Sequence, residues 1–288
     1  MKILVLGQTG QLATELSRLG TETLQVRTVP RAVADFNDPG RLAGVVAEAD
    51  ADVIINAVAY TAVDAAEKDS EAAYRVNGEA PTVLAAAAAR RSLPFLHVST
   101  DYVFNGSGDA PWQESNATAP LGAYGASKLA GEEGVRAAGG CHAVLRTSWV
   151  VSAHGNNFVK TMLRLGAERD ALSIVADQIG GPTPAGAIAQ ALVDMASQLR
   201  MDRDKSGTYH FSGAPDVSWA DFAREIFRQS GTACDVSDIP SSAYPTPAKR
   251  PGNSRMDCTK LETVFGIARP DWRVGLAGIL EELKEVTS

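Results

Sequence analysis

The sequence predicts an α/β fold, in which a doubly wound parallel sheet is joined to a smaller α/β lobe. The chain opens with a short apolar run, residues 2–6, which a glycine turn and then a helical segment follow at once. Short apolar runs then alternate with helical segments as far as about Val151. Such alternation is typical of parallel strands whose right-handed helical crossovers cover both faces of one sheet.

Composition narrows the class of protein. At 288 residues the chain is long enough for one large or two small domains, and its formal net charge of −7 argues against binding to nucleic acid. The three cysteines are odd in number and far apart, which fits a reducing compartment better than a disulfide framework or a zinc site. No apolar run approaches the ~20 residues of a membrane span, and no secretory signal pattern opens the chain. We expect a cytoplasmic protein that binds neither nucleic acid nor membranes.

The first glycine turn follows the strand predicted at residues 2–6 and reads Gly-Gln-Thr-Gly-Gln-Leu-Ala from Gly7 to Ala13. Strand, glycine turn and helix form the context of a dinucleotide site, in which the free N–H groups of the helix amino terminus face phosphates. Here Gly7 would permit the tight turn, and Gly10 would let the backbone approach a pyrophosphate. The spacing G-x-x-G-x-x-A departs from the usual G-x-G-x-x-G, so a purely structural turn stays open on this motif alone. The predicted cofactor contacts of the turn are Gly7, Thr9, Gly10, Gln11 and Leu12.

The second predicted strand, residues 24–29, bears on the choice of cofactor. No acid follows it to bind a ribose 2′-hydroxyl, whereas Arg31 would suit a 2′-phosphate, and Arg27 is an alternative. We therefore expect NADPH, with NADH possible, although a surface arginine is often only solvated. Asp35 and Phe36 are expected to flank the adenine.

The third predicted strand, residues 52–59, ends in small residues that let a ligand lie against the backbone. The predicted contacts there are Ala57, Val58 and Ala59. Helices are predicted before it, at residues 39–49, and after it, at residues 74–91. The latter leads into a further strand at residues 95–98.

The stretch from Ser99 to Lys128 carries the candidate catalytic groups. Hydroxyls at the end of the strand, Thr100 among them, lie where open α/β sheets bind ligands. Tyr124 and Lys128 are four residues apart, so they share one face of a helix. A free phenol titrates near pH ~10, and a nearby ammonium would lower that pKa toward useful acid–base chemistry. A Tyr-x-x-x-Lys pair also occurs on ordinary amphipathic helices, and the nucleotide-binding start favours the catalytic interpretation.

The later chain predicts a strand at residues 145–150 and helices at residues 188–199 and 219–229. We predict a cofactor domain formed by residues 1–149 with 171–200. The predicted substrate-binding lobe comprises residues 150–170 with 201–288.

Several segments together resemble the extended short-chain dehydrogenase/reductase superfamily, whose domain is a Rossmann fold, and the match covers essentially the whole chain. The segments that carry the resemblance are residues 7–12, 56–64, 99–106, 124–132, 146–149, 155–158 and 250–254. Ser-Thr-Asp-Tyr-Val-Phe and Thr-Ser-Trp are the most specific of them. The resemblance implies that NAD(P)H reduces the 4-keto group of dTDP-6-deoxy-L-lyxo-4-hexulose to give dTDP-L-rhamnose.

The resemblance also implies residue roles. Tyr124 would protonate the new alkoxide, Lys128 would bind the nicotinamide ribose, and Thr100 would bind the keto oxygen. The residues expected to line the sugar pocket are Asp101, Tyr102 and Trp149, although a core position for Trp149 is open. Contacts to the nucleotide or its diphosphate are expected from Asn157, Lys160 and Arg250, with solvated surface cations as the alternative for the last two.

The chain departs from the family in one respect. Some members hold magnesium between subunits through acids on the helix after the Pro-Thr loop, but residues 185–190 here contain no acid. Glu15 alone is a poor site for a hard cation. We therefore expect no metal, and a monomer or weak homodimer. The four histidines have no ligand spacing and are expected to be bystanders.

Other functions remain open on the sequence. An epimerase, a 4,6-dehydratase or another nucleotide-sugar reductase of the superfamily would share most motifs. A dehydratase is expected to follow its catalytic hydroxyl with an Asp-Glu pair, whereas Asp101 and Tyr102 follow Thr100. A non-catalytic regulatory subunit could also be built on the same fold.

Overall fold

The centre of the molecule is a parallel sheet of six strands, seen in a computed structural model that describes residues 1–287. The strand order is β10-β5-β4-β3-β1-β2, and every neighbouring pair is parallel. The strands are β1 Lys2–Leu6, β2 Gln25–Val29, β3 Val53–Asn56, β4 Phe95–Thr100, β5 His142–Thr147 and β10 Gly207–His210. The residues of β3 are all buried, and those of β1 and β5 nearly all, as suits short apolar strands covered on both faces.

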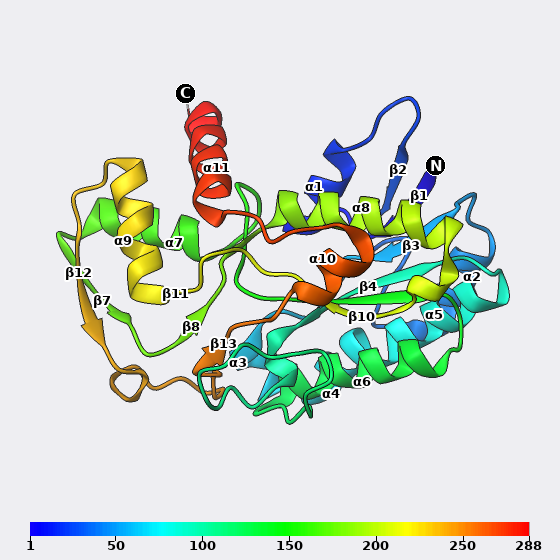
Figure 1. The fold of residues 1–288 in the computed structure, drawn as a ribbon, viewed down its shortest axis with the longest axis horizontal. Helices are drawn as coiled ribbons and strands as arrows, with labels where there is room; N and C mark the ends of the chain where they lie inside the picture. Colours follow the sequence, from blue (N-terminus) through cyan, green and yellow to red (C-terminus); the bar gives the residue numbers. More distant parts are fainter. Residues whose placement is uncertain (288) are drawn as a thin grey trace.

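Helices cover both faces of this sheet (Figure 1). One apolar layer contains α1 (Gln11–Arg18), α8 (Ala185–Met201) and α10 (Thr259–Phe265). The opposite layer contains α2 (Pro39–Ala47), α5 (Ala80–Arg90) and α6 (Ala123–Ala137). The predicted doubly wound parallel sheet is confirmed.

The strand order reverses direction at β1, which pairs with β2 on one side and with β3 on the other. At such a switch point the two crossover helices leave on opposite faces, and a crevice opens at the carboxyl ends of the strands. Gly7 follows β1 and Ala57 follows β3. The two residues meet at this crevice, since the N–H of Ala57 donates to the carbonyl of Leu6 (3.1 Å). The crevice therefore has the position expected of a cofactor site.

The helix predicted at residues 74–91 is divided into three parts: α4 Ser70–Tyr74, the π-helical turn η1 Arg75–Glu79, and α5. The π turn holds the buried side chain of Asn77, whose amide binds both backbone groups of Tyr60 and the hydroxyl of Ser127 on α6. A Cβ on Gly131 would lie 2.1 Å from the carbonyl oxygen of Asn77, so only glycine allows α6 this close. The π turn thus anchors the helix that carries Tyr124 and Lys128.

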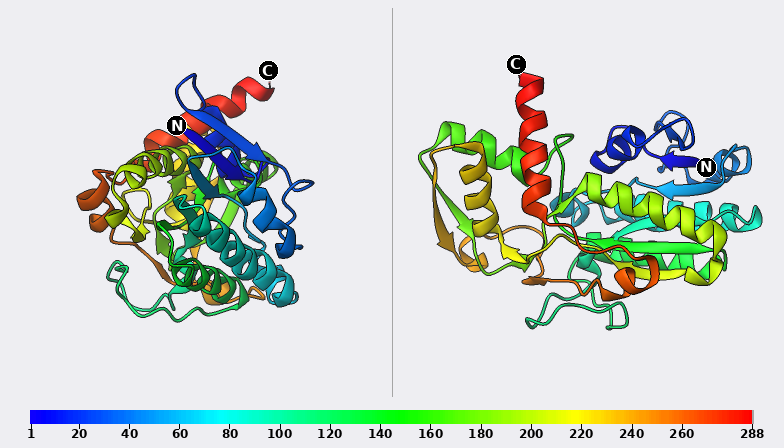
Figure 2. Two further views of the ribbon diagram at one scale, coloured as in Figure 1. Left: turned by 90° about the vertical axis from the view of Figure 1, so that its right-hand side faces the viewer. Right: turned by 45° about the horizontal axis from the view of Figure 1, so that its top comes forward.

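A second group of elements lies to one side of the six-stranded sheet (Figure 2). Its strands are β6 Val150–Val151, β7 Ala171–Val175, β8 Ile179–Gly180, β9 Thr183–Pro184, β11 Val217–Ser218, β12 Asp235–Ile239 and β13 Asn253–Ser254. They form three small sheets, β12-β7, β11-β8-β13 and β6-β9. Its helices, α7 Phe158–Glu168, α9 Trp219–Ser230 and α11 Trp272–Thr287, contribute to a third apolar cluster that includes Phe222 and Trp272. Short elements complete the chain: α3 Val63–Ala66, η2 Asp101–Val103, η3 Arg203–Lys205 and η4 Ser241–Ala243.

Four strands lie elsewhere than the predicted domain division puts them. β7, β8 and β9, assigned to the cofactor domain, lie in the small sheets of the second group, and β10, assigned to the lobe, pairs with β5 in the main sheet. All four are short strands whose partners are set by contacts distant in sequence, which local patterns do not encode. The rest of the division stays a prediction. Within residues 1–287, no helix is both long and apolar enough to cross a membrane.

Candidate active site

Three polar residues, Thr100, Asp101 and Tyr102, lie at the end of β4 and in the turn η2 that follows it. Thr100 is the last residue of β4, and its hydroxyl accepts a hydrogen bond from the N–H of Tyr102 (3.2 Å), which starts the short turn η2. The same hydroxyl donates to Oδ1 of Asp101 at 3.0 Å. Asp101 is only 3 % exposed, and its Oδ2 has no hydrogen-bond partner among the described residues. Burial raises the pKa of Asp101 to about 6, although the nearby hydroxyls of Ser254 and Thr100 act against the rise.

Tyr124 lies in the first turn of α6, against η2. Its ring meets that of Tyr102 edge to face, with centroids 5.5 Å apart. Gly125 makes this approach possible, because a Cβ there would lie 2.2 Å from the carbonyl oxygen of Tyr102. Burial raises the pKa of Tyr124 to about 12, while its hydrogen bond with Thr100 lowers it and the charge of Asp101 raises it. Thr100 and Tyr124 are therefore brought together as predicted.

Lys128, one turn further along α6, is 2 % exposed and faces the sheet. Its Nζ donates to the carbonyl of Val98 (2.7 Å) and contacts Nε2 of His97 (3.4 Å). Burial lowers the pKa of Lys128 to about 8, and Glu132 partly opposes this. The expectation that Lys128 lowers the pKa of Tyr124 is wrong for this structure, because burial dominates at both groups and the ammonium is bound by Val98. His97 is packed in the core, where it joins Lys128 to Asn56 (Nδ1 to Nδ2, 3.1 Å).

A buried ion pair lies beneath these residues and was not predicted. Arg146 on β5 binds both carboxylate oxygens of Glu132 on α6, at 2.9 and 2.7 Å, and Ser99 donates to Oε1 at 2.6 Å. Burial raises the pKa of Glu132, but Arg146, Ser99 and Arg136 together outweigh it, so the net shift is downward. The pair fixes α6 to β4 and β5. Glu132 and Arg146 both lie in segments of the family resemblance, and no local signal pairs them.

The glycine turn after β1 fits a dinucleotide. Gly7 has φ +106°, in the region that favours glycine, and its missing Cβ would lie 3.1 Å from Val58. Gly10 is exposed with open space around it, and α1 begins there without a side-chain cap, so its first N–H groups are free for phosphates. Thr9 is exposed and Ala57, Val58 and Ala59 are half-buried beside the turn, whereas Leu12 points into the core. The glycine turn and residues 57–59, but not Leu12, thus fit the phosphates of NADPH.

The residues expected at the adenine end of the cofactor differ in how exposed they are. Arg31 is exposed and its Nε lies 3.5 Å from Oδ1 of Asp35. The pKa of Asp35 is lowered, mainly by the N–H of Asn37. Phe36 is 4 % exposed and belongs to the apolar layer under α2, so it offers little surface to an adenine.

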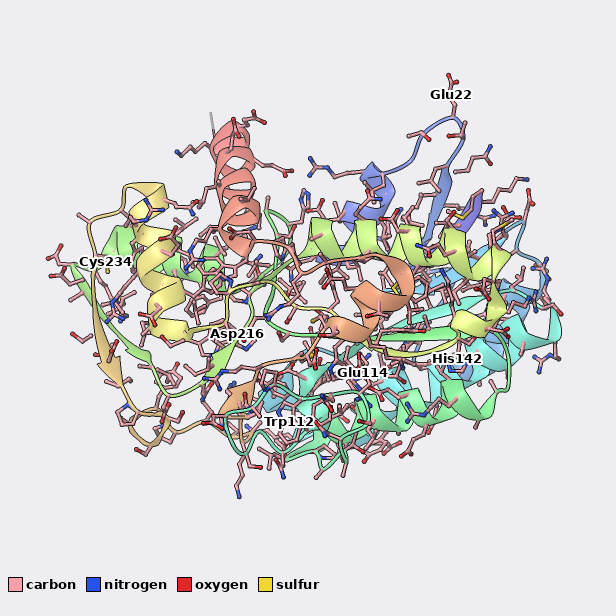
Figure 3. The ribbon with its side chains drawn as sticks, in the orientation of Figure 1. Glu22, Trp112, Glu114, His142, Asp216 and Cys234 are labelled. Atoms are coloured by element: carbon pink, nitrogen blue, oxygen red, sulfur yellow. The ribbon has the colours of Figure 1, made fainter. Side chains whose placement is uncertain are left out.

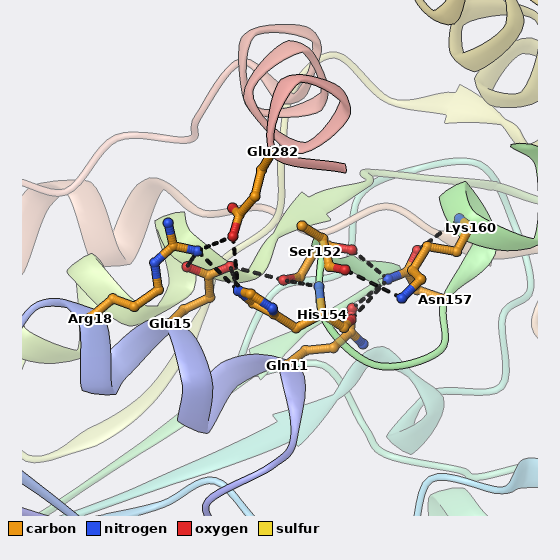
Figure 4. A network of polar contacts seen from close by, with 9 residues as sticks. Gln11, Glu15, Arg18, Ser152, His154, Asn157, Lys160 and Glu282 are labelled. Carbon is orange, nitrogen blue, oxygen red and sulfur yellow. Dashed lines mark hydrogen bonds and ion pairs between the residues drawn. The ribbon is translucent and has the colours of Figure 1, made fainter. Parts of the chain in front are cut away.

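Gln11 connects the glycine turn to the lobe (Figure 4). Nδ2 of Asn157 donates to Oε1 of Gln11 (2.9 Å) and to the carbonyls of Ser152 (2.7 Å) and His154 (3.3 Å), while Oδ1 caps α7 by accepting from the N–H of Lys160. Nζ of Lys160 donates to the carbonyl of Ala153 (3.3 Å). Asn157 and Lys160, predicted as substrate contacts, are thus both engaged within the protein.

The same figure shows a second cluster between α1 and α11. Arg18 binds Glu282, His154 lies near Glu15 and Glu282, and Ser152 donates to Glu15. Among residues 1–287 no group of three or more His, Cys, Asp or Glu side chains is arranged to hold a metal ion. His142 and Cys234 lie far apart, His142 with the six-stranded sheet and Cys234 near the edge of the second group of elements (Figure 3).

Two predicted substrate residues have aromatic or ionic partners. Trp149 has φ 47° and stacks on Trp219 with ring centroids 3.5 Å apart, so one face of its indole is already covered. Arg250 forms a two-point ion pair with Asp64, and burial, the largest influence on its pKa, is outweighed by that pairing. Arg250 is therefore not a lone solvated cation. A narrow space beside this pair is lined by Val63, Tyr102, Tyr124 and Lys249, among others.

Comparisons with known proteins agree along the whole chain. The sequence profile of the family described as "RmlD substrate binding domain" matches residues 1–285. A dTDP-4-dehydrorhamnose reductase of Burkholderia thailandensis is 45 % identical over 98 % of this chain and 99 % of its own, and one of Escherichia coli is 39 % identical over the full length of both. A solved dTDP-4-dehydrorhamnose reductase of Clostridium acetobutylicum has a TM-score of 0.91 at 34 % identity, covering 99 % of this chain and 100 % of that one.

A solved dTDP-4-dehydrorhamnose reductase of Bacillus anthracis, in complex with NADP, has a TM-score of 0.90 at 33 % identity and covers 98 % of this chain and 99 % of that one. The profile, the curated relatives and the solved structures each span nearly all of the described residues, including both halves of the site. The chain belongs to the RmlD substrate binding domain family.

Proposed function

We propose that the protein is an NADPH-dependent oxidoreductase that reduces the 4-keto group of dTDP-6-deoxy-L-lyxo-4-hexulose to give dTDP-L-rhamnose, as a dTDP-4-dehydrorhamnose reductase does. Whole-length relatives of that name, at 39 to 45 % identity, support it. The observation that carries the chemistry is the meeting of Thr100 and Tyr124 beside the carboxyl end of β4, with Lys128 one helical turn away.

Each of these residues has a role that its surroundings support. NADPH supplies the hydride when it is bound. Tyr124 gives its proton to the oxygen that was the ketone, and its raised pKa of about 12 keeps that proton in place at neutral pH. Thr100 donates a hydrogen bond to the same oxygen as charge develops. Lys128 binds the nicotinamide ribose, for which its buried ammonium must turn from Val98.

The cofactor would lie over the glycine turn, with its pyrophosphate at the amino terminus of α1. Gly7, Gly10 and the residues 57–59 would form the floor of that site, and Arg31 would bind the 2′-phosphate. Arg31 already lies near Asp35, so that carboxylate would have to share it. The NADP bound to the Bacillus anthracis relative supports this choice of cofactor.

The sugar nucleotide would bind between the main sheet and the lobe. Asp101 and Tyr102 would face the sugar, and Trp149 would close the pocket with the edge of its indole. Arg250, held by Asp64, would bind the diphosphate, because a planar guanidinium fixed by one carboxylate still has donors left for phosphate oxygens. The oligomeric state, the absence of a metal and the cytoplasmic location stay predictions.

The test is incubation of the purified protein with NADPH and the keto-sugar nucleotide. We expect loss of nicotinamide absorbance in step with formation of dTDP-L-rhamnose, one equivalent each. An epimerase or dehydratase would change the sugar without net oxidation of NADPH, and a regulatory subunit would change nothing. Either result would contradict the proposal.

A further inference from the structure

The hydroxyl of Thr100 has one proton, and the structure shows where that proton goes. Its oxygen accepts from the N–H of Tyr102, donates to Oδ1 of Asp101 (3.0 Å) and is also in hydrogen-bond contact with the phenol of Tyr124. A threonine hydroxyl has one donor and two acceptor sites. While Asp101 is ionised and can only accept, the single donor is used by that carboxylate and is not free for a keto oxygen.

Asp101 is unusual as a carboxylate in this place. It is 3 % exposed, and its Oδ2 has no hydrogen-bond partner within residues 1–287. An unpartnered oxygen of a buried carboxylate is far more costly than the unpartnered carbonyl oxygen of a neutral acid. The side chains around it are neutral: the phenols of Tyr102 on η2 and Tyr124 on α6, and the hydroxyl of Ser254 on β13. Of the charged side chains in this region, Lys128 on α6 is bound to Val98 and His97, and Arg250, which acts on Tyr102, is paired with Asp64.

We propose that Asp101 is a positioning residue which, in its protonated form, donates to Thr100 and so turns the Thr100 hydroxyl toward the substrate keto oxygen. The inference deepens the proposed function and rests on it. Protonated at Oδ1, the carboxyl donates along the existing contact, and the bond between the two side chains reverses direction. Thr100 then accepts from Tyr102 and Asp101, the phenol of Tyr124 turns from Thr100 to the keto oxygen, and the proton of Thr100 is free for that same oxygen. No proton leaves Asp101 in the reaction, since Tyr124 supplies the one that the product keeps.

The raised pKa of Asp101, about 6, makes this form accessible near neutrality. The active form is present below this pKa and is lost as the pH rises through it. Tyr124 cannot cause such a loss, since its pKa is about 12, and Lys128 would contribute a separate change near pH 8.

The experiment measures the rate of hydride transfer in single turnovers between pH 5.5 and 7.5, in the full-length protein with NADPH and the keto-sugar nucleotide. The wild-type rate should fall roughly tenfold or more from pH 5.5 to 7.5, because Asp101, whose pKa is about 6, must be protonated for this step. Asp101→Asn donates permanently through its amide, so its rate should change less than about twofold over the same range. Glu114→Gln removes another acid whose burial raises its pKa, outside the site, and should keep the wild-type pH profile.

The following outcomes decide between a positioning role for Asp101 and its alternatives. A pH profile in Asp101→Asn that equals wild type, or a wild-type rate that is flat, overturns the inference while leaving the reductase activity established. In a Thr100→Val background, Asp101→Asn should have no further effect on the pH dependence of the rate. If Asp101 acted only by holding the structure, Asp101→Asn would still change that pH dependence, and the inference would be overturned. If wild type fails to oxidise NADPH, the proposed function fails instead. The Asp101 carboxyl can then still be titrated by carbon NMR with NADP bound, and ionisation throughout pH 5 to 8 would overturn the inference independently.

Discussion

Asp64 and Arg250, 186 positions apart in the sequence, form a two-point ion pair with contacts of 3.1 Å (Oδ1 to Nη1) and 2.8 Å (Oδ2 to Nη2). Arg250 also donates to the carbonyl of Ala248, so its guanidinium is held from two sides. The pKa of Asp64 is lowered, first by the hydrogen bond from Arg250, which shows that the carboxylate stays charged at neutral pH. The pair joins α3, which follows β3, to the segment before β13.

Arg250→Ala should raise the Michaelis constant for the sugar nucleotide by about tenfold to a hundredfold, since hydrogen bonds to a charged group are worth ~1.5–3 kcal/mol. NADPH affinity should stay the same. Asp64→Asn should give a smaller change in the same direction, because the arginine remains but is less well held. Arg228→Ala, which breaks an exposed pair on α9, is the control. Steady-state kinetics that do not change toward the sugar nucleotide would leave Arg250 with a structural role only.

Tyr124→Phe keeps the ring that packs on Tyr102 and removes the transferable proton. Turnover should fall by about 10²–10⁴-fold, the usual range for a general acid, while NADPH affinity changes little. Stopped-flow measurement with the deuterated nicotinamide shows whether hydride transfer limits the rate. Near-normal turnover with that step limiting would remove Tyr124 from its proposed role.

Arg31→Ala should weaken NADPH binding and leave NADH binding unchanged, because only NADPH has a 2′-phosphate. The Arg31–Asp35 contact lies at the surface, with 76 % of the arginine side chain exposed, so its loss should cost at most ~1 kcal/mol of stability. Binding of both cofactors is measured by calorimetry. Arg27→Ala serves as the comparison: selectivity lost there and kept in Arg31→Ala would move the phosphate contact to Arg27.

Glu132→Gln should lower the free energy of unfolding by about 3–5 kcal/mol, because it leaves Arg146 buried with its charge uncompensated. The pKa of Glu132 is lowered in the folded state. Its stabilisation is therefore complete above the ordinary glutamate pKa of ~4.3 and is lost as the pH falls through the lower folded-state value. Urea unfolding at several pH values measures both effects.

Glu225→Gln is the matched control for that variant. The pKa of Glu225 is lowered to about 2, mainly by Arg228, yet the arginine side chain is 69 % exposed and solvent screens the pair. A loss of ~0–1 kcal/mol is expected there. Equal losses for the two variants would show that burial does not set the strength of the Glu132–Arg146 pair.

Local sequence patterns predicted the parallel sheet and the positions of Thr100, Tyr124 and Lys128, since strand ends and one-turn helical spacing are local properties. They did not predict partners that meet only after folding, such as Asp64 with Arg250. The same holds for β10, whose place in the main sheet depends on β5. Burial reversed one expectation: a lysine near a tyrosine suggests a lowered phenol pKa, but Lys128 is itself desolvated and held by Val98. Whether a side chain faces solvent or core decides such cases, and spacing alone does not report it.

Asn157, predicted as a substrate contact, offers a sharp test between two roles. Its amide binds Gln11 in the turn proposed to hold the pyrophosphate, and its Oδ1 caps α7. Asn157→Ser keeps a capping oxygen but is too short to reach Gln11, so stability should fall by less than ~1 kcal/mol.

If Asn157 acts through Gln11, Asn157→Ser should weaken NADPH binding about two- to tenfold, the value of one neutral hydrogen bond. Gln11→Ala should do the same, and the double variant should be no worse than either single one. If Asn157 instead binds the sugar nucleotide directly, the Michaelis constant for that substrate should rise while NADPH binding is kept. Titration of each variant with NADPH, followed by steady-state kinetics, separates the two roles, because Gln11 contacts Asn157 from the cofactor side of the crevice.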